Sequence, residues 1–151
     1  MLNHKLRFLA VLLSGAALVA GCQSAGPNGQ GPVTRDGVFV HVSKGNEDPH
    51  AVLMALKMAT LMSADRDALV YFDLKGVNVV LKDAKDVSFP TFDSSKAQIT
   101  ALINKGIPLY VCPGCLKATG KKPEDVMPGV KIAEEDAFFS FTKGRILTLD
   151  Y

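Results

Sequence analysis

Two cysteines, Cys112 and Cys115, are separated only by Pro113 and Gly114. Two thiols at this spacing can form a dithiol-disulfide couple, because one thiol can react while the other resolves the product. The first thiol could equally carry sulfur as a persulfide, which requires one accessible thiolate. A zinc site needs more ligands than two thiols, and the sequence has neither a second C-x-x-C pair nor a nearby His-x-x-x-His motif. The pair therefore predicts redox or sulfur-carrier chemistry, with no metal.

The residues around this pair predict a strand followed by a helix. Residues 107–111 form a short apolar run that is typical of a buried strand, and Pro113 and Gly114 interrupt it. Residues 115–119 favour a helix that stops at Gly120. We therefore expect Cys112 to close the strand and Cys115 to lie in the first helical turn, where unpaired backbone N–H groups stabilise a thiolate.

Three polar residues after the first predicted strand are candidates to assist the thiols. Functional residues of parallel sheets gather at the carboxyl ends of the strands, so the loop after residues 37–43 is expected beside Cys112. Lys44, Asn46 and His50 could then stabilise a thiolate, and two of them can be cationic. The alternative is that Lys44 is a solvated loop lysine and His50 a surface residue of the first helical turn.

No bound cofactor is predicted. A flavin would need a loop that cradles a phosphate, and Lys44-Gly45-Asn46 is too short a basis for one. His41 is the only polar side chain inside the first predicted strand, and we expect a core histidine that is satisfied by a hydrogen bond.

The first 21 residues predict a secretory signal. Lys5 and Arg7 precede an apolar run, residues 8–20, that is too short to span a bilayer. The run ends in Ala-Gly-Cys22, which resembles the lipobox of bacterial lipoproteins, so Cys22 is predicted to receive a lipid anchor. The alternative is an ordinary secretory signal with an incidental cysteine. We expect an exported lipoprotein of the cell envelope, on the periplasmic side of the inner or outer membrane.

Residues 22–36 are rich in Gly, Pro, Ser, Asn and Gln and predict a lipidated, flexible tether with a reach of roughly 20 Å. Of 17 Lys and Arg, two lie in the signal, and the remaining 15 balance the 15 Asp and Glu. A chain without excess positive charge does not favour nucleic acid as a partner. With Cys22 used for lipid, the pair at Cys112 and Cys115 holds the only other cysteines.

Predicted strands and helices alternate along residues 37–151, which favours one α/β domain with a mostly parallel sheet of about five strands and helices on both faces. The expected strands are residues 37–43, 68–73 with an apolar continuation at 77–81, 107–111, 130–133 and 145–151. The expected helices are residues 49–64, 94–105 and 134–142.

The stretch from Gly106 through Cys112 and Cys115 to Gly120, followed by Met127-Pro128-Gly129-Val130, resembles the signature of the DsrE/DsrF-like family. The resemblance implies a three-layer, flavodoxin-like domain that assembles into trimers or hexamers. Some members relay sulfur as a cysteine persulfide, with a protein as sulfur donor or redox partner. The sulfur-carrying cysteine of the family falls on Cys112, and Cys115 matches a second cysteine that only some members have.

These observations predict a membrane-tethered sulfur or thiol carrier, with Cys112 as nucleophile or persulfide site and Cys115 as its resolving partner. The alternative, from a different functional class, is a non-catalytic oligomeric binding or scaffold module of the cell envelope. In that case the two thiols would be unreactive.

Overall fold

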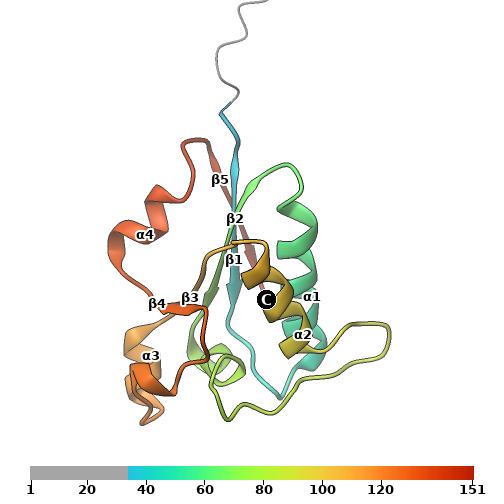
Figure 1. Cartoon of the computed structure of the whole chain (residues 1–151), viewed down its shortest axis with the longest axis vertical. Coiled ribbons are helices and arrows are strands. Elements are labelled where there is room, and N and C mark those ends of the chain that lie inside the picture. The colour runs from blue at the N-terminus through green and yellow to red at the C-terminus, as the bar shows by residue number, and fades with distance from the viewer. Residues whose placement is uncertain (1–33) are drawn as a thin grey trace, which may run out of the picture. The chain divides into compact units, whose positions relative to one another are not determined.

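A computed structural model describes residues 34–151, apart from the side chains of residues 137 and 139. The predicted signal at residues 1–21, the lipidation site Cys22 and most of the predicted tether lie outside the described residues. The described part of the chain forms a five-stranded sheet in which every pair of neighbouring strands is parallel (Figure 1). The strands are β1 (Gly37–Val42), β2 (Asp67–Phe72), β3 (Leu109–Val111), β4 (Val130–Ile132) and β5 (Ile146–Asp150).

Helices cover both faces of the sheet, as the sequence predicts (Figure 1). Helices α1 (Pro49–Met62) and α2 (Ser95–Asn104) pack against each other on one face, and α4 (Glu135–Ser140) lies on the other. The short helix α3 (Pro113–Ala118) follows β3 directly. Among residues 34–151, none of the helices has both the length and the apolar character needed to cross a bilayer.

The two faces of β1 differ, because side chains of a strand alternate between the faces of the sheet. Val38, Val40 and Val42 are fully buried and belong to the core that α1 and α2 cover. Phe39 and His41 point to the face of α4, where they are only half-buried. The aromatic and polar side chains of the sheet therefore gather on the second face.

The order of the strands is β4-β3-β2-β1-β5. The chain moves one position along the sheet at each of its first three connections and then returns to place β5 beside β1. All five strands end at the same edge because they are parallel. Strand β2, however, separates β1 from β3 at that edge.

The predicted strand at residues 77–81 is wrong. A 3-10 helix, η1 (Leu74–Val79), takes its place, and Leu81 makes only an isolated antiparallel bridge to Val126. The chain turns sharply at Leu74, whose φ is 42°. Gly76 then packs so tightly on β1 that an added Cβ would lie 2.0 Å from the carbonyl oxygen of Val42. A glycine is therefore required where η1 contacts the end of β1.

Candidate functional site

Cys112 lies between β3 and α3 and caps the helix. Strand β3 ends at Val111, and Pro113 occupies the first helical position. The backbone N–H of Cys115 donates to the Sγ atom of Cys112 across 3.2 Å. The helix thus begins at Pro113, two residues earlier than the sequence predicts. The thiol that accepts a hydrogen bond from a free N–H group of the first turn is therefore that of Cys112.

The surroundings of Cys112 favour the thiolate form of its side chain. Burial raises the pKa of Cys112, but the neighbouring Tyr71 hydroxyl, the Cys115 residue and the backbone N–H of Gly114 together lower it by more. The net result is a pKa below that of an ordinary thiol. A thiol with a lowered pKa is the more reactive nucleophile near neutral pH.

Cys115 has the opposite character. Burial raises the pKa of Cys115, the hydrogen bond with Cys112 raises it further, and the charge of Asp73 acts in the same direction. The backbone N–H of Leu74 also bonds to this thiol and opposes these effects only in part. Both cysteines are free thiols and half-buried. The two sulfur atoms therefore differ in acidity although they share one turn of the chain.

His41 lies at the same edge of the sheet, between two carboxylates. Its Nδ1 atom is 2.7 Å from Oδ1 of Asp150, and its Nε2 atom is 2.8 Å from Oδ1 of Asp73. The side chains of His41 and Asp73 are only 25% and 19% exposed. Burial lowers the pKa of His41, but the two carboxylates outweigh burial and hold it above the ordinary value of 6.5. The expected hydrogen bond of this histidine is the one between Nδ1 and Asp150, whereas Nε2 and Oδ1 of Asp73 are close but do not have hydrogen-bond geometry.

Tyr71 connects His41 with the cysteines. The two rings are stacked, with their centroids 5.9 Å apart and their planes at 24°. Tyr71 pairs with His41 of β1 on one side and with Tyr110 of β3 on the other. Burial raises the pKa of Tyr71 well above the usual range, and the neighbouring Cys112 adds to this. The phenol therefore keeps its proton near neutral pH.

Lys44 and His50 are both exposed and are not among the groups that shift the Cys112 pKa most. The His50 ring stacks on Phe89 with centroids 4.6 Å apart, next to Phe92, at the start of α1. Lys44 and Asn46 belong to the loop after β1, which packs on η1 through Gly45. Because β2 lies between β1 and β3, the loop after β2 takes the place beside Cys112.

Sequence reasoning missed Tyr71 and Asp73, which are the neighbours of the two thiols. Asp73 is the last residue of the predicted second strand, and Tyr71 shares its face of that strand by the alternation of side chains. This pattern places both at the carboxyl edge of the sheet. It identifies them as neighbours of the cysteines only once β2 is known to lie beside β3.

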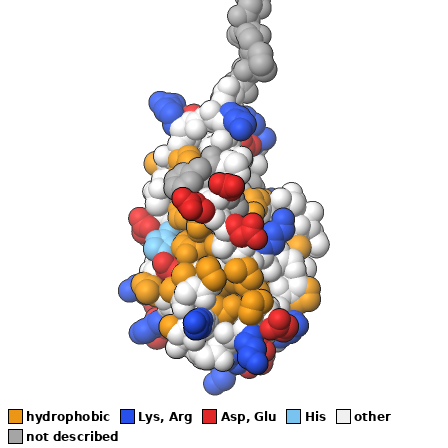
Figure 2. All heavy atoms as spheres, turned by 90° about the vertical axis from the view of Figure 1, so that its left-hand side faces the viewer, with side chains coloured by type: hydrophobic (Ala, Val, Ile, Leu, Met, Phe, Trp, Pro, Cys, Tyr) orange, Lys and Arg blue, Asp and Glu red, His pale blue; other side chains and the backbone are white. Residues whose placement is uncertain are grey.

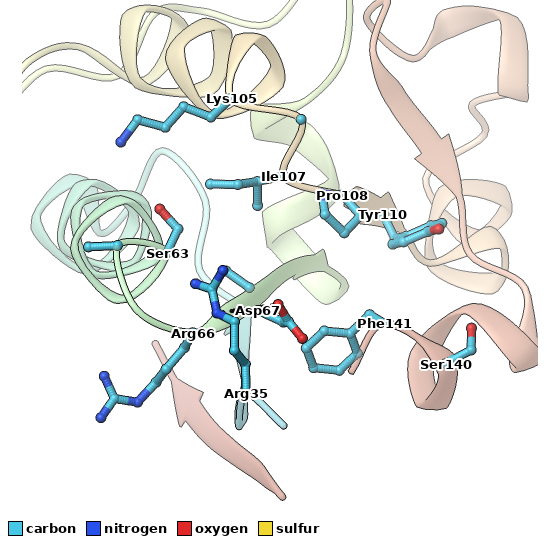
Figure 3. A pocket seen from close by; sticks show the side chains of 13 residues that line it. Arg35, Ser63, Arg66, Asp67, Lys105, Ile107, Pro108, Tyr110, Ser140 and Phe141 are labelled. Atoms are coloured by element: carbon cyan, nitrogen blue, oxygen red, sulfur yellow. Dashed lines mark ion pairs between the residues drawn. The ribbon is translucent and has the colours of Figure 1, made fainter. Parts of the chain in front are cut away.

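A cavity of about 290 Å³ lies beside the cysteine turn and is lined by Pro113, Leu116 and Ile132 among others. A cavity of about 540 Å³ opens at the other end of the sheet, and Arg35, Ser63 and Ile107 are among the residues that line it (Figure 3). A groove of about 350 Å³ on the face of α4 is lined by Phe39, Tyr71, Phe138, Ile146 and Thr148. Hydrophobic side chains gather on this face of the molecule (Figure 2).

In residues 34–151 we find no group of three or more His, Cys, Asp or Glu side chains that could hold a metal ion. The two ring nitrogens of His41 lie beside different carboxylates, those of Asp73 and Asp150. What the site offers chemically is one thiol with a lowered pKa, a second thiol with a raised pKa, and a partly buried phenol.

Several solved structures share this fold. The protein of unknown function MTH1491 from Methanobacterium thermoautotrophicum has 18% sequence identity and a TM-score of 0.57, over 76% of this chain and 99% of that one. The ychN protein from E. coli has 15% identity and a TM-score of 0.58, over 77% of this chain and 99% of that one. At these identities the likeness shows the fold alone.

A search of curated proteins gave no significant match. The model of the DsrE/DsrF-like family, in contrast, matches residues 36–143, which include all of the site except Asp150. This chain belongs to the DsrE/DsrF-like family.

Proposed function

We propose that this protein is a sulfur carrier in which Cys112 accepts sulfur as a persulfide and Cys115 resolves it. Membership of the DsrE/DsrF-like family supports a sulfur-relay-type role. The observation that carries the finer proposal is the difference between the two thiols. The pKa of Cys112, raised by burial, is lowered more by hydrogen bonds, whereas burial and Cys112 itself raise the pKa of Cys115.

The first step is the attack of the Cys112 thiolate on the outer sulfur of a persulfide donor, R–S–SH. A bond forms between Sγ and the outer sulfur, and the S–S bond of the donor breaks. The donor leaves as R–S⁻ with the electron pair of that bond, and the proton remains on the transferred sulfur. The step needs no other oxidant or reductant, since sulfur passes from one thiol to another.

The second step uses Cys115. Its sulfur attacks Sγ of the Cys112 persulfide, a disulfide forms between the two cysteines, and hydrogen sulfide leaves with the protons of the Cys115 thiol and the persulfide. A dithiol reductant must then open the disulfide by exchange, which returns both cysteines to thiols. An acceptor thiol that takes the outer sulfur first would instead regenerate the Cys112 thiol directly.

We also propose export, a lipid anchor on Cys22 and assembly into a trimer or hexamer. Export is supported by the apolar run before Cys22 and by its Ala-Gly-Cys ending. The described chain enters the sheet at Gly37, at the edge opposite to the one that carries Cys112. The proposed tether therefore joins the domain at the edge of the sheet opposite the thiols, and a sulfur-donor or redox protein is the proposed partner of those thiols.

Intact-mass measurement tests the proposal. The full mature chain is incubated with inorganic polysulfide and measured before and after treatment with a reductant. In Cys115→Ser, which cannot resolve the persulfide, we expect a gain of one sulfur atom that the reductant removes, and we expect no gain in Cys112→Ser. An unchanged mass in Cys115→Ser would support the non-catalytic scaffold module instead.

A further inference from the structure

We infer that the cavity beside the cysteine turn is the docking site for the protein that exchanges sulfur with Cys112, and that this protein presents an apolar side chain flanked by carboxylates. The cavity, called the α3 cavity below, has a volume of about 290 Å³ and is lined by residues of α3, of the 3-10 helix η2 (Pro123–Asp125) and of β4. The inference rests on the proposed function in taking Cys112 as the reacting thiol, and it adds the class of partner.

Four of the seven residues that line the α3 cavity are apolar, namely Pro113, Leu116, Pro123 and Ile132. Leu116 is only 2% exposed and belongs to the hydrophobic core, against which Ile132 packs. The two prolines are exposed. An apolar side chain of a partner would cover this surface, and its removal from water favours binding.

The other three lining residues are lysines, and none of the described residues that line the cavity is acidic. Lys121 is paired with Asp83, with 2.9 Å between Nζ and Oδ2. Lys117 and Lys122 are exposed, and within residues 34–151 neither side chain forms an ion pair. The α3 cavity therefore combines an apolar lining with two positive charges that carboxylates of a partner would complement.

The turn after α3 fixes the backbone that carries the lysines. Gly120 has a φ of 72°, the left-handed conformation that glycine adopts at the end of many helices. The N–H of Gly120 donates to the carbonyl of Lys117 across 3.0 Å, and the N–H of Lys121 donates to the carbonyl of Leu116 across 3.1 Å. The cavity is therefore formed before a partner arrives, which lowers the entropic cost of binding.

The lining of the α3 cavity begins at the residue that follows Cys112. Pro113, Leu116 and Lys117 are three and four positions apart and so share one face of α3. The Sγ atom of Cys112 lies at the start of the same helix, where it accepts the N–H of Cys115 across 3.2 Å. A segment bound along this face therefore has one end beside the thiol, as exchange of sulfur requires.

A small inorganic anion suits the α3 cavity less well. Such an anion loses water when it is buried, and hydrogen-bond donors must replace that water. The charged donors here are the ammonium groups of lysines that are exposed or half-exposed, and the remaining lining is apolar. A protein segment uses both features, because its apolar side chain covers the lining while its carboxylates stay in water near the lysines.

The test compares two synthetic peptides that alkylate thiols through an N-terminal chloroacetyl group, which loses chloride to a thiolate. One peptide has a leucine flanked by acidic residues, and the other has lysine in place of each acid. Their rates at Cys112 of the full mature chain are measured at low salt by mass mapping and divided by the rate of chloroacetamide, which reports the intrinsic reactivity of the thiol. We expect the acidic peptide to react about tenfold faster than the basic one. Lys117→Glu combined with Lys122→Glu should remove most of this advantage.

Lys57→Glu combined with Lys105→Glu is the matched control, because it changes the net charge equally at two exposed lysines outside the α3 cavity. We expect the control to keep most of the advantage of the acidic peptide. An equal loss in the control would overturn the inference, because it would show an effect of net charge alone. Equal rates of the two peptides with the wild-type chain would also overturn it, whatever the variants do.

Persulfide formation with inorganic polysulfide is measured on the same samples. If the Lys117→Glu and Lys122→Glu variant slows it as much as it slows the acidic peptide, the lysines bind a small anion and the inference is overturned. Peptide selectivity without any persulfide contradicts the proposed function and leaves the docking site intact. Persulfide without peptide selectivity contradicts only the docking site.

Discussion

The backbone N–H of Cys115 donates to the Sγ atom of Cys112 across 3.2 Å, so the second residue of the pair stabilises the thiolate of the first. The hydrogen bond depends on the helical turn that starts at Pro113 and not on the Cys115 side chain. The same turn brings the Cys115 thiol close to Cys112, where it becomes less acidic. One local structure thus makes the two sulfur atoms unequal.

This inequality predicts different reactivity toward an alkylating reagent. Near neutral pH, iodoacetamide should modify Cys112 faster than Cys115, because a larger fraction of Cys112 is thiolate. Cys115→Ser should keep most of the reactivity of Cys112, since the backbone N–H remains. Site-resolved mass spectrometry measures both rates, and faster modification of Cys115 would contradict the assignment of the two roles.

Lys44 and His50 should have less influence on Cys112 than Tyr71 has. Lys44 is exposed in the loop after β1, His50 is stacked on Phe89, and β2 separates both from β3. We therefore expect Lys44→Gln and His50→Gln to change the alkylation rate of Cys112 less than Tyr71→Phe does. A larger loss of reactivity in Lys44→Gln would show that this lysine reaches the thiol in solution.

His41, which lies between two carboxylates, predicts a dependence of stability on pH. Burial lowers the pKa of His41, but Asp150 and Asp73 raise it above 6.5, so the folded state binds this proton more tightly than the unfolded state. The resulting stabilisation is fully present below pH 6.5 and is lost as the pH rises through the folded-state pKa. In urea unfolding, the stability advantage of the wild type over His41→Gln should shrink across this range. An advantage that grows with pH would mean that the histidine is neutral when folded.

Gly76 should tolerate no side chain. A Cβ at this position would lie 2.0 Å from the Val42 carbonyl oxygen, and backbone cannot give way as a flexible side chain can. Gly76→Ala should lower the free energy of unfolding by about 2 kcal/mol or more. Gly114→Ala is the control, since its nearest neighbour would be Sγ of Cys112 at an ordinary 3.9 Å. We expect the control to change stability by less than about 1 kcal/mol, because alanine favours the helix.

Much of the fold follows from the sequence because its strands are short apolar runs that are bounded by clear turn residues. One example is the apolar run that forms β1. Another is Asp48-Pro49, which predicts the start of α1, and the side chain of Asp48 accepts a hydrogen bond from the N–H of Ala51 there. The segment at residues 77–81 misled because its apolar residues are buried in a 3-10 helix rather than in a strand. Burial alone does not distinguish the two.

The candidate site was predictable in part. The position of Cys112 at the end of a strand follows from the break at Pro113 and Gly114. Its neighbours depend on the order of the strands, which local sequence does not encode. The loop after β1 seemed the natural neighbour, but the place is taken by Asp73 and Leu74, which follow β2.

The central claim, that Cys112 accepts sulfur and Cys115 resolves it, is tested most directly by mapping sulfur after a single exposure to polysulfide. In Cys115→Ser we expect the persulfide to accumulate on Cys112. In the wild-type chain we expect release of sulfide and a disulfide between Cys112 and Cys115. Two results would contradict the claim. One is a persulfide on Cys115 in the Cys112→Ser variant that forms as fast as the wild-type chain reacts. The other is the lack of a persulfide on Cys112 in the Cys115→Ser variant.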